Sequence, residues 1–268
     1  MWRVETAMTM LVVGGAAGDR RPVDDRRLAT AVDSIAALDS ASVDEMFDLY
    51  ASYYDGTSRR LFEHDLRDKH HVVTLRTGAG TLAGFSTLAL VNFDAEAPAV
   101  AIFSGDTIID QPYWGTQALA FTWIRFAGSI KARAPDRPLF WFLIVKGHRT
   151  YRYLSAFSID FFPHWTLATP PRSQAIMDAL ARGRFAERYD PGRGVVSFAQ
   201  SQGHLKPEWA AVTAEEVARS DVAFFLHRNP GYVRGDEMVC LTELAAHNLR
   251  PLARRVFEQG LRAGAPPT

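Results

Sequence analysis

The chain has 268 residues, of which 47% are hydrophobic and 12% aromatic, and its 30 Lys and Arg residues balance 30 Asp and Glu residues. This length supplies enough apolar material for one large domain or two small ones. The balanced charge gives no indication of a nucleic-acid or membrane-surface partner. The single cysteine, Cys240, excludes an intrachain disulfide and a multi-cysteine metal site. No apolar run approaches the ~20 residues that cross a bilayer, so we predict a cytoplasmic protein.

Residues 1–27 are rich in Gly, Ala, Asp and Arg and show no hydrophobic periodicity. We predict a flexible N-terminal arm there, because such a segment buries too little apolar surface to offset the entropy of ordering it. A strand is expected within residues 28–38. Two helices should follow, because Ser42 and either Thr57 or Ser58 are N-cap residue types that precede apolar residues at helical spacing.

Three strands are predicted next, at His71–Arg76, Leu82–Phe93 and Ala99–Ile109. The first two are joined by Thr77-Gly-Ala-Gly, whose glycines suit a hairpin turn. The three strands should therefore form an antiparallel meander.

The third strand also begins a βαβ crossover unit. It meets a turn at Asp110-Gln-Pro, after which we predict a long aromatic helix, Thr116–Ala134, and a second apolar strand, Leu139–Val145. A further helix begins in Lys146-Gly-His-Arg-Thr-Tyr-Arg-Tyr-Leu. Helices that begin just after strands hold phosphate groups on their free backbone N–H groups.

Residues 166–268 have a weaker pattern, and we expect a C-terminal α/β extension. Predicted elements are helices at Ser173–Arg188 and Glu215–Leu226, strands at Val195–Phe198 and around Cys240, and a terminal helix at Glu243–Arg262. Cys240 lies in an alternating apolar run, which indicates a buried structural thiol.

This order of elements resembles that of the GNAT superfamily of N-acetyltransferases, over roughly residues 28–165. The resemblance implies an α/β fold whose mixed, mostly antiparallel sheet is flanked by helices, with the C-terminal extension completing the sheet and covering the acceptor side. It also implies that strand 99–109 splays from its neighbour and pairs with the pantetheine arm of a donor. The next turn would hold the pyrophosphate of coenzyme A on backbone N–H groups.

The turn itself departs from the family pattern Arg/Gln-x-x-Gly-x-Gly/Ala. The sequence here is Asp110-Gln-Pro-Tyr-Trp-Gly-Thr-Gln-Ala-Leu, in which Gln111 matches the first position and bulky Trp114 or Gln117 replaces a small residue. These side chains should crowd a pyrophosphate, and no Arg or Lys lies in the turn. The turn and the run Leu139–Leu154 are similar to the divergent branch that uses long-chain acyl donors, including N-acyl amino acid synthases and lipopeptide maturases.

The resemblance implies a set of residues that bind the donor thioester: Ile108, Ile109, Gln111, Trp114, Gly115, Thr116, Gln117, Arg149 and Arg152. The two arginines would contact a phosphopantetheine phosphate or an acidic carrier-protein helix, and solvated helix charges are an equally good interpretation. Phe121 and Trp123 would line a fatty-acyl tunnel, in which each buried methylene contributes ~0.8 kcal/mol. For any single aromatic residue, ordinary core packing is the alternative.

Four residues are candidates for acid–base chemistry, because amide formation needs a proton acceptor for the amine and a proton donor for the thiolate. Asp106, late on the splayed strand, is a candidate base, or else a turn or surface carboxylate. His148 either acts as a base or caps the helix that it begins. Tyr151 and Tyr153 lie where the family often places a tyrosine acid. Two residues apart on a helix, they face different ways, so at most one should reach the thiolate.

The sequence thus predicts an N-acyltransferase that moves a medium- or long-chain acyl group from an acyl-CoA or acyl-carrier-protein thioester to an amine of a peptide or amino acid. Transfer should be direct and metal-free, since no activated nucleophile or ligand cluster is visible. Expected partners are an acyl carrier protein and a precursor peptide, and a homodimer is possible. The alternatives are a catalytically silent relative that binds an acyl ligand or a partner, and an ordinary acetyltransferase of small amines.

Overall fold

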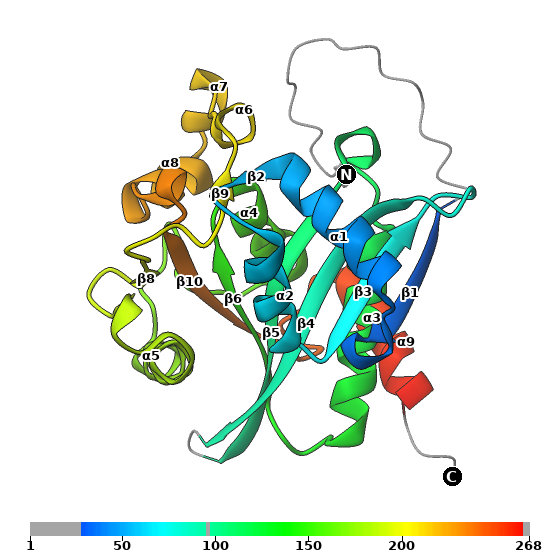
Figure 1. Ribbon diagram of the computed structural model, residues 1–268. Coiled ribbons are helices and arrows are strands. Elements are labelled where there is room, and N and C mark those ends of the chain that lie inside the picture. The colour runs from blue at the N-terminus through cyan, green and yellow to red at the C-terminus, as the bar shows by residue number, and fades with distance from the viewer. Residues whose placement is uncertain (1–27, 95–96, 265–268) are drawn as a thin grey trace, which may run out of the picture.

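A computed structural model of the protein describes residues 28–94 and 97–264, so the predicted arm at 1–27 lies outside the described residues. One eight-stranded sheet dominates, in the order β1-β3-β4-β5-β6-β10-β8-β7 (Figure 1). Its strands are β1 (Ala29–Ser34), β3 (His71–Arg76), β4 (Leu82–Asp94), β5 (Pro98–Ile109), β6 (Leu139–Val145), β10 (Glu237–Glu243), β8 (Val195–Val196) and β7 (Tyr189–Asp190). A second, two-stranded sheet joins β2 (Tyr54–Asp55) to β9 (His204–Leu205).

Nine α-helices lie in the described ranges: α1 (Ser40–Tyr53), α2 (Arg59–Arg67), α3 (Ala118–Arg133), α4 (His148–Phe157), α5 (Pro171–Phe185), α6 (Pro207–Ala210), α7 (Ala214–Val217), α8 (Ser220–Arg228) and α9 (Pro251–Gly264). Short 3-10 turns are η2 (Ile35–Ala37), η3 (Gln111–Tyr113), η4 (Ala186–Arg188) and η5 (Tyr232–Arg234). All pairs in the large sheet are antiparallel except β5 with β6. The prediction of a mixed, mostly antiparallel sheet flanked by helices is confirmed.

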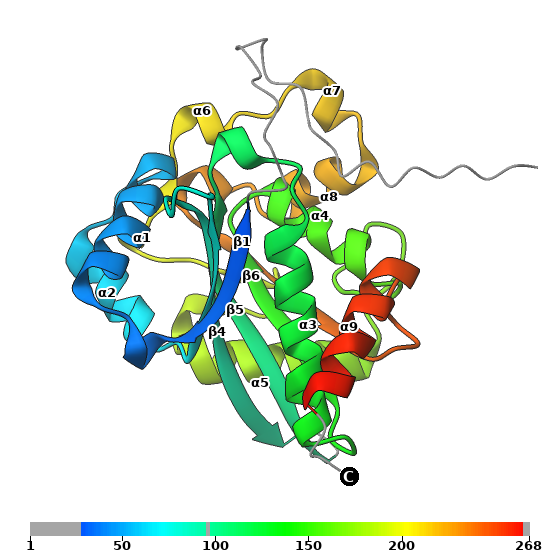
Figure 2. The same ribbon diagram turned by 90° about the vertical axis from the view of Figure 1, so that its right-hand side faces the viewer.

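Helices cover both faces of the large sheet. α3 and α9 pack on one face and α1 and α2 on the other (Figure 2). α5 covers the second face further along, where its apolar residues meet Phe103 and Phe142. The β5 residues Ile102 and Phe103 belong to clusters on opposite faces, as the alternation of side chains along a strand requires.

The close packing of α3 on α9 depends on two glycines. A Cβ added at Gly128 would collide with the carbonyl oxygen of Phe257, and one at Gly260 with that of Arg125. The missing side chains therefore let the two helix backbones approach each other directly.

Two helices predicted in the C-terminal extension are wrong in their extent. The helix expected at 215–226 is broken into α7 and α8, because Arg219 has the extended backbone of an N-cap residue (φ −81°, ψ 132°). The terminal helix begins at Pro251 rather than residue 243, since β10 continues to Glu243 and proline suits the first helical turn.

The feature that positions the site is the separation of β5 from β6. Their parallel pairing runs from Val100 opposite Leu139 to Ser104 opposite Leu143 and stops there, although both strands continue. β5 stays paired with β4 on its other edge up to Ile109. The splayed strand implied by the family resemblance is present, and β10, the strand around Cys240, closes the far side of β6.

None of the helices in the described ranges combines the length and hydropathy that a membrane-spanning segment needs.

Candidate active site

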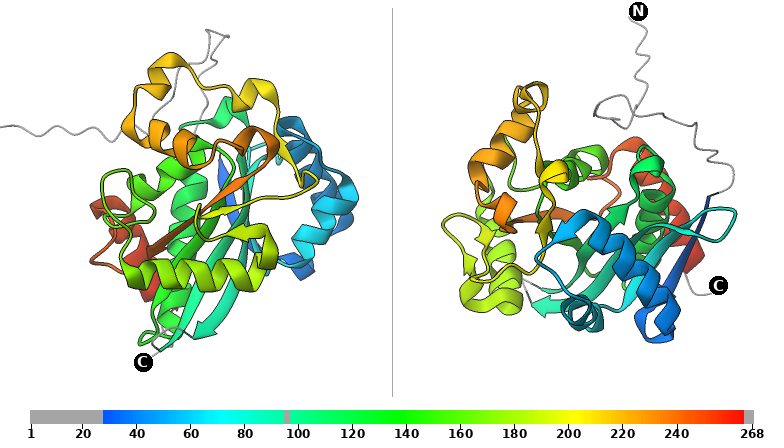
Figure 3. Two further views of the ribbon diagram at one scale, coloured as in Figure 1. Left: turned by 90° about the vertical axis from the view of Figure 1, so that its left-hand side faces the viewer. Right: turned by 45° about the horizontal axis from the view of Figure 1, so that its top comes forward.

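A cavity of about 330 Å³ opens where β5 and β6 separate. Its lining comes from five parts of the chain: the end of α1 with β2, the end of β5, the turn before α3, the length of α4, and the segment from β9 to η5. α6, α7 and α8 gather at the same end of the molecule as α4, and the extension thus supplies the outer wall (Figures 1 and 3).

Seven of the nine predicted donor-binding residues line this cavity: Ile108, Ile109, Trp114, Gly115, Thr116, Arg149 and Arg152. The other two, Gln111 and Gln117, do not. Gln111 is exposed in η3, and its backbone N–H donates to the Tyr53 hydroxyl (2.6 Å). Gln117 is the N-cap residue of α3 but makes no side-chain capping bond.

The turn before α3 is held by local hydrogen bonds. The Tyr53 hydroxyl donates to Asp110 Oδ1 (2.7 Å), and the Trp114 indole N–H donates to the Ile109 carbonyl oxygen (2.7 Å). Gly115 has a left-handed φ of 97°, which only glycine adopts without strain. The Trp114 ring is thereby fixed as one wall of the cavity, where it meets Trp209 at 5.5 Å between ring centroids.

Asp106 lies on β5 two residues beyond the last residue paired with β6, and Thr107 beside it lines the cavity. Its neighbour Gly105 leaves room for the Lys69 side chain, which a Cβ there would strike. Burial, reinforced by the negative charge of Asp65, raises the pKa of Asp106 to about 6. The carboxylate is therefore poised to accept a proton near neutral pH.

Two further ionisable residues at this point were missed from the sequence. Lys146 follows β6, and its Nζ lies 3.4 Å from Oε1 of Glu237, the first residue of β10. Burial raises the pKa of Glu237 to about 7, whereas the surrounding negative charges keep that of Lys146 well above its usual value despite burial. The available signal was a charged residue directly beside a buried apolar run: Lys146 after Leu139–Val145, and Glu237, preceded by Asp236, before Met238.

The two candidate tyrosines of α4 lie in different surroundings. Tyr151 is fully buried, donates its hydroxyl hydrogen to the Pro163 carbonyl oxygen (2.8 Å) and does not line the cavity. Tyr153 lines the cavity and stacks on Phe157 at 5.8 Å. The structure thus brings Tyr153, and not Tyr151, to the site. Burial raises the pKa of Tyr153, so its hydroxyl keeps its proton at neutral pH.

His148 begins α4 and lines the cavity, but it caps nothing: the N-cap residue is Gly147. Its Nε2 lies 3.2 Å from Glu216 Oε1, and Glu216 is also the N3 residue of a capping box with Thr213. Burial lowers the pKa of His148, and the Arg149 charge adds to this effect. A neutral imidazole bound to Glu216 ties α4 to α7.

Three arginines line the cavity, and each already has a carboxylate partner. Arg149 contacts Glu216 (3.5 Å), while Arg152 and Arg219 both contact Asp221 (3.2 and 3.3 Å). Arg149 also lies over the Trp114 ring, and its buried Nε has no hydrogen-bond partner among the described residues. Arg219, which comes from the extension, carries no signal in the local sequence.

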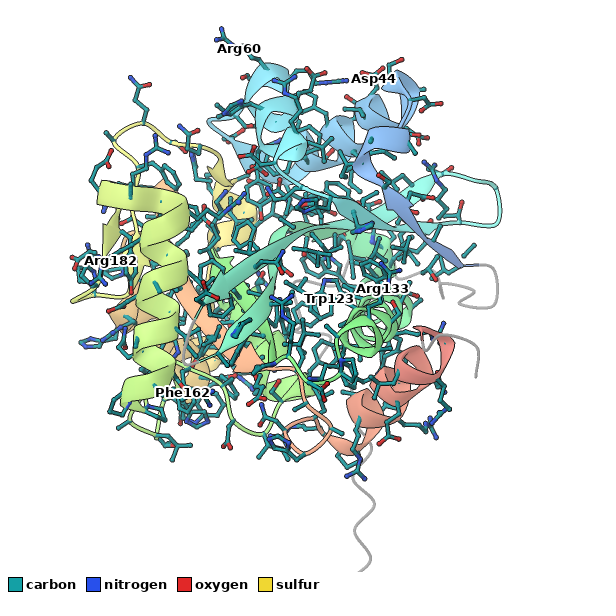
Figure 4. All side chains as sticks on the ribbon, turned by 90° about the horizontal axis from the view of Figure 1, so that it is seen from below. Asp44, Arg60, Trp123, Arg133, Phe162 and Arg182 are labelled. Atoms are coloured by element: carbon teal, nitrogen blue, oxygen red, sulfur yellow. The ribbon has the colours of Figure 1, made fainter. Side chains whose placement is uncertain are left out.

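The predicted acyl-tunnel residues lie elsewhere. Phe121 and Trp123 do not line the cavity, and Trp123 packs between α3 and the sheet against Trp141, with 4.7 Å between ring centroids (Figure 4). Trp123 belongs to the core cluster of α3 and the sheet, and Phe121 packs against it partly buried, so neither residue lies in this cavity. Two residues apart on α3, the two rings leave the helix on different sides: Trp123 is buried against the sheet, and Phe121 is only partly buried.

Cys240 is fully buried, and burial raises the pKa of its thiol well above the usual value, which makes it a poor nucleophile. Within the described ranges, no group of three or more His, Cys, Asp and Glu side chains is placed to hold a metal ion.

No protein-family model and no curated protein matches the chain. Three solved structures illustrate what it is similar to. A conserved protein of unknown function from Enterococcus faecalis, described as a probable N-acyltransferase, is 14% identical with a TM-score of 0.37, over 50% of this chain and 33% of that one. An acetyltransferase from Trypanosoma brucei is 13% identical with a TM-score of 0.37, over 53% and 98% of the two chains. A GNAT family N-acetyltransferase from Escherichia coli, in complex with CoA, is 14% identical with a TM-score of 0.35, over 49% and 68%.

The match thus spans a third of the Enterococcus protein. At these identities and TM-scores, the similarities assign the chain neither a family nor an activity.

Proposed function

We propose that the chain is a GNAT-like N-acyltransferase, which transfers an acyl group directly from a thioester to an amine. The observation that carries this proposal is the cavity at the separation of β5 and β6, with Asp106 on the strand beside it and Tyr153 in its wall. Tyr153 is the proposed proton donor in the cavity wall, and Asp106 is the proposed proton acceptor on β5, next to Thr107, which lines the cavity. Amide formation needs both kinds of group.

The donor arm fits the cavity because β5 has an unpaired edge there. Beyond Ser104 the backbone N–H and C=O groups on the β6 side of β5 have no strand partner in the described part of the chain. Such an edge binds an extended chain of amide groups by strand-like hydrogen bonds. The pantetheine arm of coenzyme A or of a carrier protein carries two amides on an otherwise apolar chain, and Ile108, Tyr153 and Phe157 offer apolar walls.

The acceptor amine approaches from the face of the large sheet that α1 and α2 cover. Asp106 lies on this face. An ammonium R–NH3⁺ gives one proton to the Asp106 carboxylate, and its freed lone pair attacks the thioester carbonyl carbon. The N–C bond forms and the C–S bond breaks. The thiolate takes a proton from Tyr153, which regains one from the amide nitrogen, so that one proton per turnover returns to solvent from Asp106.

The finer assignment is a medium- or long-chain donor, in the form of acyl-CoA or acyl carrier protein, and an amine acceptor on a peptide or amino acid. Support for the chain length comes from the apolar lining along α4, where Tyr153, Ala156 and Phe157 replace Phe121 and Trp123 as acyl-contacting residues. Support for a phosphorylated donor comes from Arg149, Arg152 and Arg219. We assign residues 166–268 to the covering of the site.

The test is turnover and binding with an acyl-length series of CoA and phosphopantetheine thioesters, offered with amino acids and short peptides. Thiol release that depends on the amine supports the proposal. Absence of both turnover and binding with every thioester contradicts it.

A catalytically silent acyl-binding protein is the second candidate, favoured by the paired arginines and the Trp114 wall. Native mass spectrometry of the purified protein separates the two. A retained acyl ligand without amine-dependent thiol release favours the binding protein.

A further inference from the structure

α4 and α8 lie side by side, which brings charged residues from two distant parts of the chain to one wall of the cavity (Figure 2). The Tyr151 ring of α4 stacks on the rings of Phe224 and Phe225 of α8, with 5.9 and 6.3 Å between centroids. This aromatic contact fixes the start of α8 relative to α4. Arg152 follows Tyr151 on α4, Arg219 directly precedes α8, and both arginines line the cavity.

Asp221 joins these two arginines. Its Oδ2 lies 3.2 Å from Arg152 Nε, and its two oxygens accept from Nε and Nη2 of Arg219 (3.3 Å each). The Asp221 side chain is only 8% exposed and does not line the cavity. Its Oδ1 also accepts from the backbone N–H of Val222 (3.0 Å), which fixes the carboxylate in the first turn of α8. Asp221 therefore holds two guanidinium groups together at the wall.

The charges of this group do not balance, because two guanidinium groups share one carboxylate. The Arg152 side chain is only 16% exposed. Burial lowers the pKa of Arg152, and the positive charge of Arg219 adds to this effect. A buried positive charge costs free energy unless an anion compensates it. One further anion in the cavity would compensate the second guanidinium.

The two arginines also have donors left for such an anion. A guanidinium carries five N–H donors, and Asp221 contacts Nε of Arg152 and Nε and Nη2 of Arg219. Within the described ranges, both terminal nitrogens of Arg152 and Nη1 of Arg219 have no hydrogen-bond partner. Arg149 differs, since its Nη1 donates to the Trp209 carbonyl oxygen (2.8 Å). A phosphate group offers several acceptor oxygens and suits paired guanidinium groups.

We propose that Arg152 and Arg219 together bind one phosphate group of the acyl donor, and that Asp221 is the positioning residue that holds them as a pair. The ligand class is a phosphate mono- or diester at the end of a pantetheine arm. Arg219 and Asp221 belong to the C-terminal extension, so the extension supplies part of the donor site and does more than cover it. The identity of the donor rests on the proposed function, whereas the binding of phosphate by the pair does not require acyl transfer.

The test is isothermal titration of the full chain with phosphopantetheine and with pantetheine, which differ only by the phosphate. Wild type should bind phosphopantetheine more tightly. Arg219→Gln should lose about tenfold in affinity for phosphopantetheine and none for pantetheine, as expected for one charged hydrogen bond. Asp221→Asn should show a similar loss, although it removes a negative charge, because two guanidinium groups without their shared anion repel each other and separate.

The matched controls are Arg182→Gln and Asp178→Asn, which alter an arginine–carboxylate pair of α5 (3.5 Å) outside the cavity. Both should leave the two affinities unchanged. Coenzyme A, as a third ligand, distinguishes the sources of the phosphate: tighter binding than phosphopantetheine assigns it to coenzyme A, and weaker binding to a carrier-bound arm. Arg219→Gln should weaken the favoured ligand in either case.

Equal affinities of wild type for phosphopantetheine and pantetheine, or an unaltered ratio in Arg219→Gln, overturn the inference. Tighter binding of phosphopantetheine by Asp221→Asn also overturns it, because Asp221 would then compete with the phosphate instead of positioning its ligands. If Asp221→Asn does not fold, Arg152→Gln and Arg219→Gln decide. Phosphate-dependent binding without amine-dependent thiol release supports the inference while the proposed function fails. Turnover of acyl-CoA with the same KM in wild type and Arg219→Gln has the opposite meaning.

Discussion

Tyr151 and Tyr153 lie two residues apart on α4, yet the first donates its hydroxyl to the Pro163 carbonyl oxygen in the core and the second lines the cavity. Two residues advance ~200° around an α-helix, so the two rings necessarily point to opposite sides. Of the two, only Tyr153 lines the cavity, and the proposed function therefore gives it the role of protonating the leaving thiolate.

Tyr153→Phe should therefore lower kcat by about 10²-fold while KM for the thioester changes little, since a general acid contributes on the order of 10²–10⁴. Tyr151→Phe is the matched control. It should keep kcat and lose about 1 kcal/mol of unfolding free energy with its buried hydrogen bond. Steady-state kinetics and denaturant unfolding measure both. A larger loss of kcat in Tyr151→Phe would contradict the assignment.

The protonation of Asp106 should determine the pH below which the proposed activity falls. Because burial raises its pKa to about 6 and the base works ionised, kcat/KM should fall as the pH decreases through about 6. Asp106→Asn should lose about 10²-fold or more in kcat and abolish this limb. A pH profile of wild type and variant measures it; Asp48→Asn, on the exposed side of α1, is the control.

Ionised Asp106 should also lower the free energy of unfolding at high pH. The folded-state pKa of Asp106 lies above its ordinary value near 3.8, so its contribution favours folding below that value and is lost as the pH rises through about 6. Asp106→Asn should therefore be more stable than wild type at pH 8, by about 3 kcal/mol, and the difference should nearly vanish at pH 4. Thermal unfolding at the two pH values measures it.

Arg149 should matter only for donors that carry phosphate. Its Nε is buried without a partner among the described residues, and a charged hydrogen bond contributes about 1.5–3 kcal/mol, so Arg149→Gln should raise KM for acyl-CoA on the order of tenfold. KM for the corresponding acyl-pantetheine, which has no phosphate, should stay the same. Arg182→Gln, on the exposed side of α5, is the control. Equal losses for both donors would show that Arg149 acts by packing.

The length of the acyl chain should be selected by contacts along α4. Ala156→Phe fills part of the cavity, so kcat/KM should fall by about tenfold or more for a medium-length acyl donor and little for acetyl. Phe121→Leu, outside the cavity, should leave the chain-length profile unaltered. If Phe121→Leu alters that profile and Ala156→Phe does not, the acyl group lies against α3.

The α3–α9 contact predicts that substitution by alanine changes stability in opposite directions at two helical glycines. Gly128→Ala should destabilise the fold by about 2 kcal/mol or more, because its Cβ would meet the Phe257 backbone. A Cβ at Gly183 in α5 meets, outside its own helix backbone, no atom of the described residues within 4 Å, so Gly183→Ala should stabilise by about 0.5–1 kcal/mol through helix propensity. Denaturant unfolding of the two variants measures the contrast.

The local pattern of the sequence was sufficient for much of the fold. Runs of apolar residues indicated β3, β4, β5 and β6. The cap candidates Thr57 and Ser58 marked the start of α2, which Ser58 caps. The order of these elements then indicated the mixed sheet. Prediction failed where local signals compete: the extended backbone at Arg219 and the Pro251 start of α9 were hidden within apparently continuous helical spacing.

By itself the sequence determined that a strand at 99–109 carries Asp106 and ends at a turn, because strand and turn signals are local. Only the tertiary structure decided which tyrosine reaches the cavity, that Phe121 and Trp123 lie outside it, and that Glu237 meets Lys146. A helical period gives the angle between two side chains but not the face that a sheet will cover. The Lys146–Glu237 pair depends on the register of β10 against β6, and long-range strand pairing leaves no trace in the spacing of either segment.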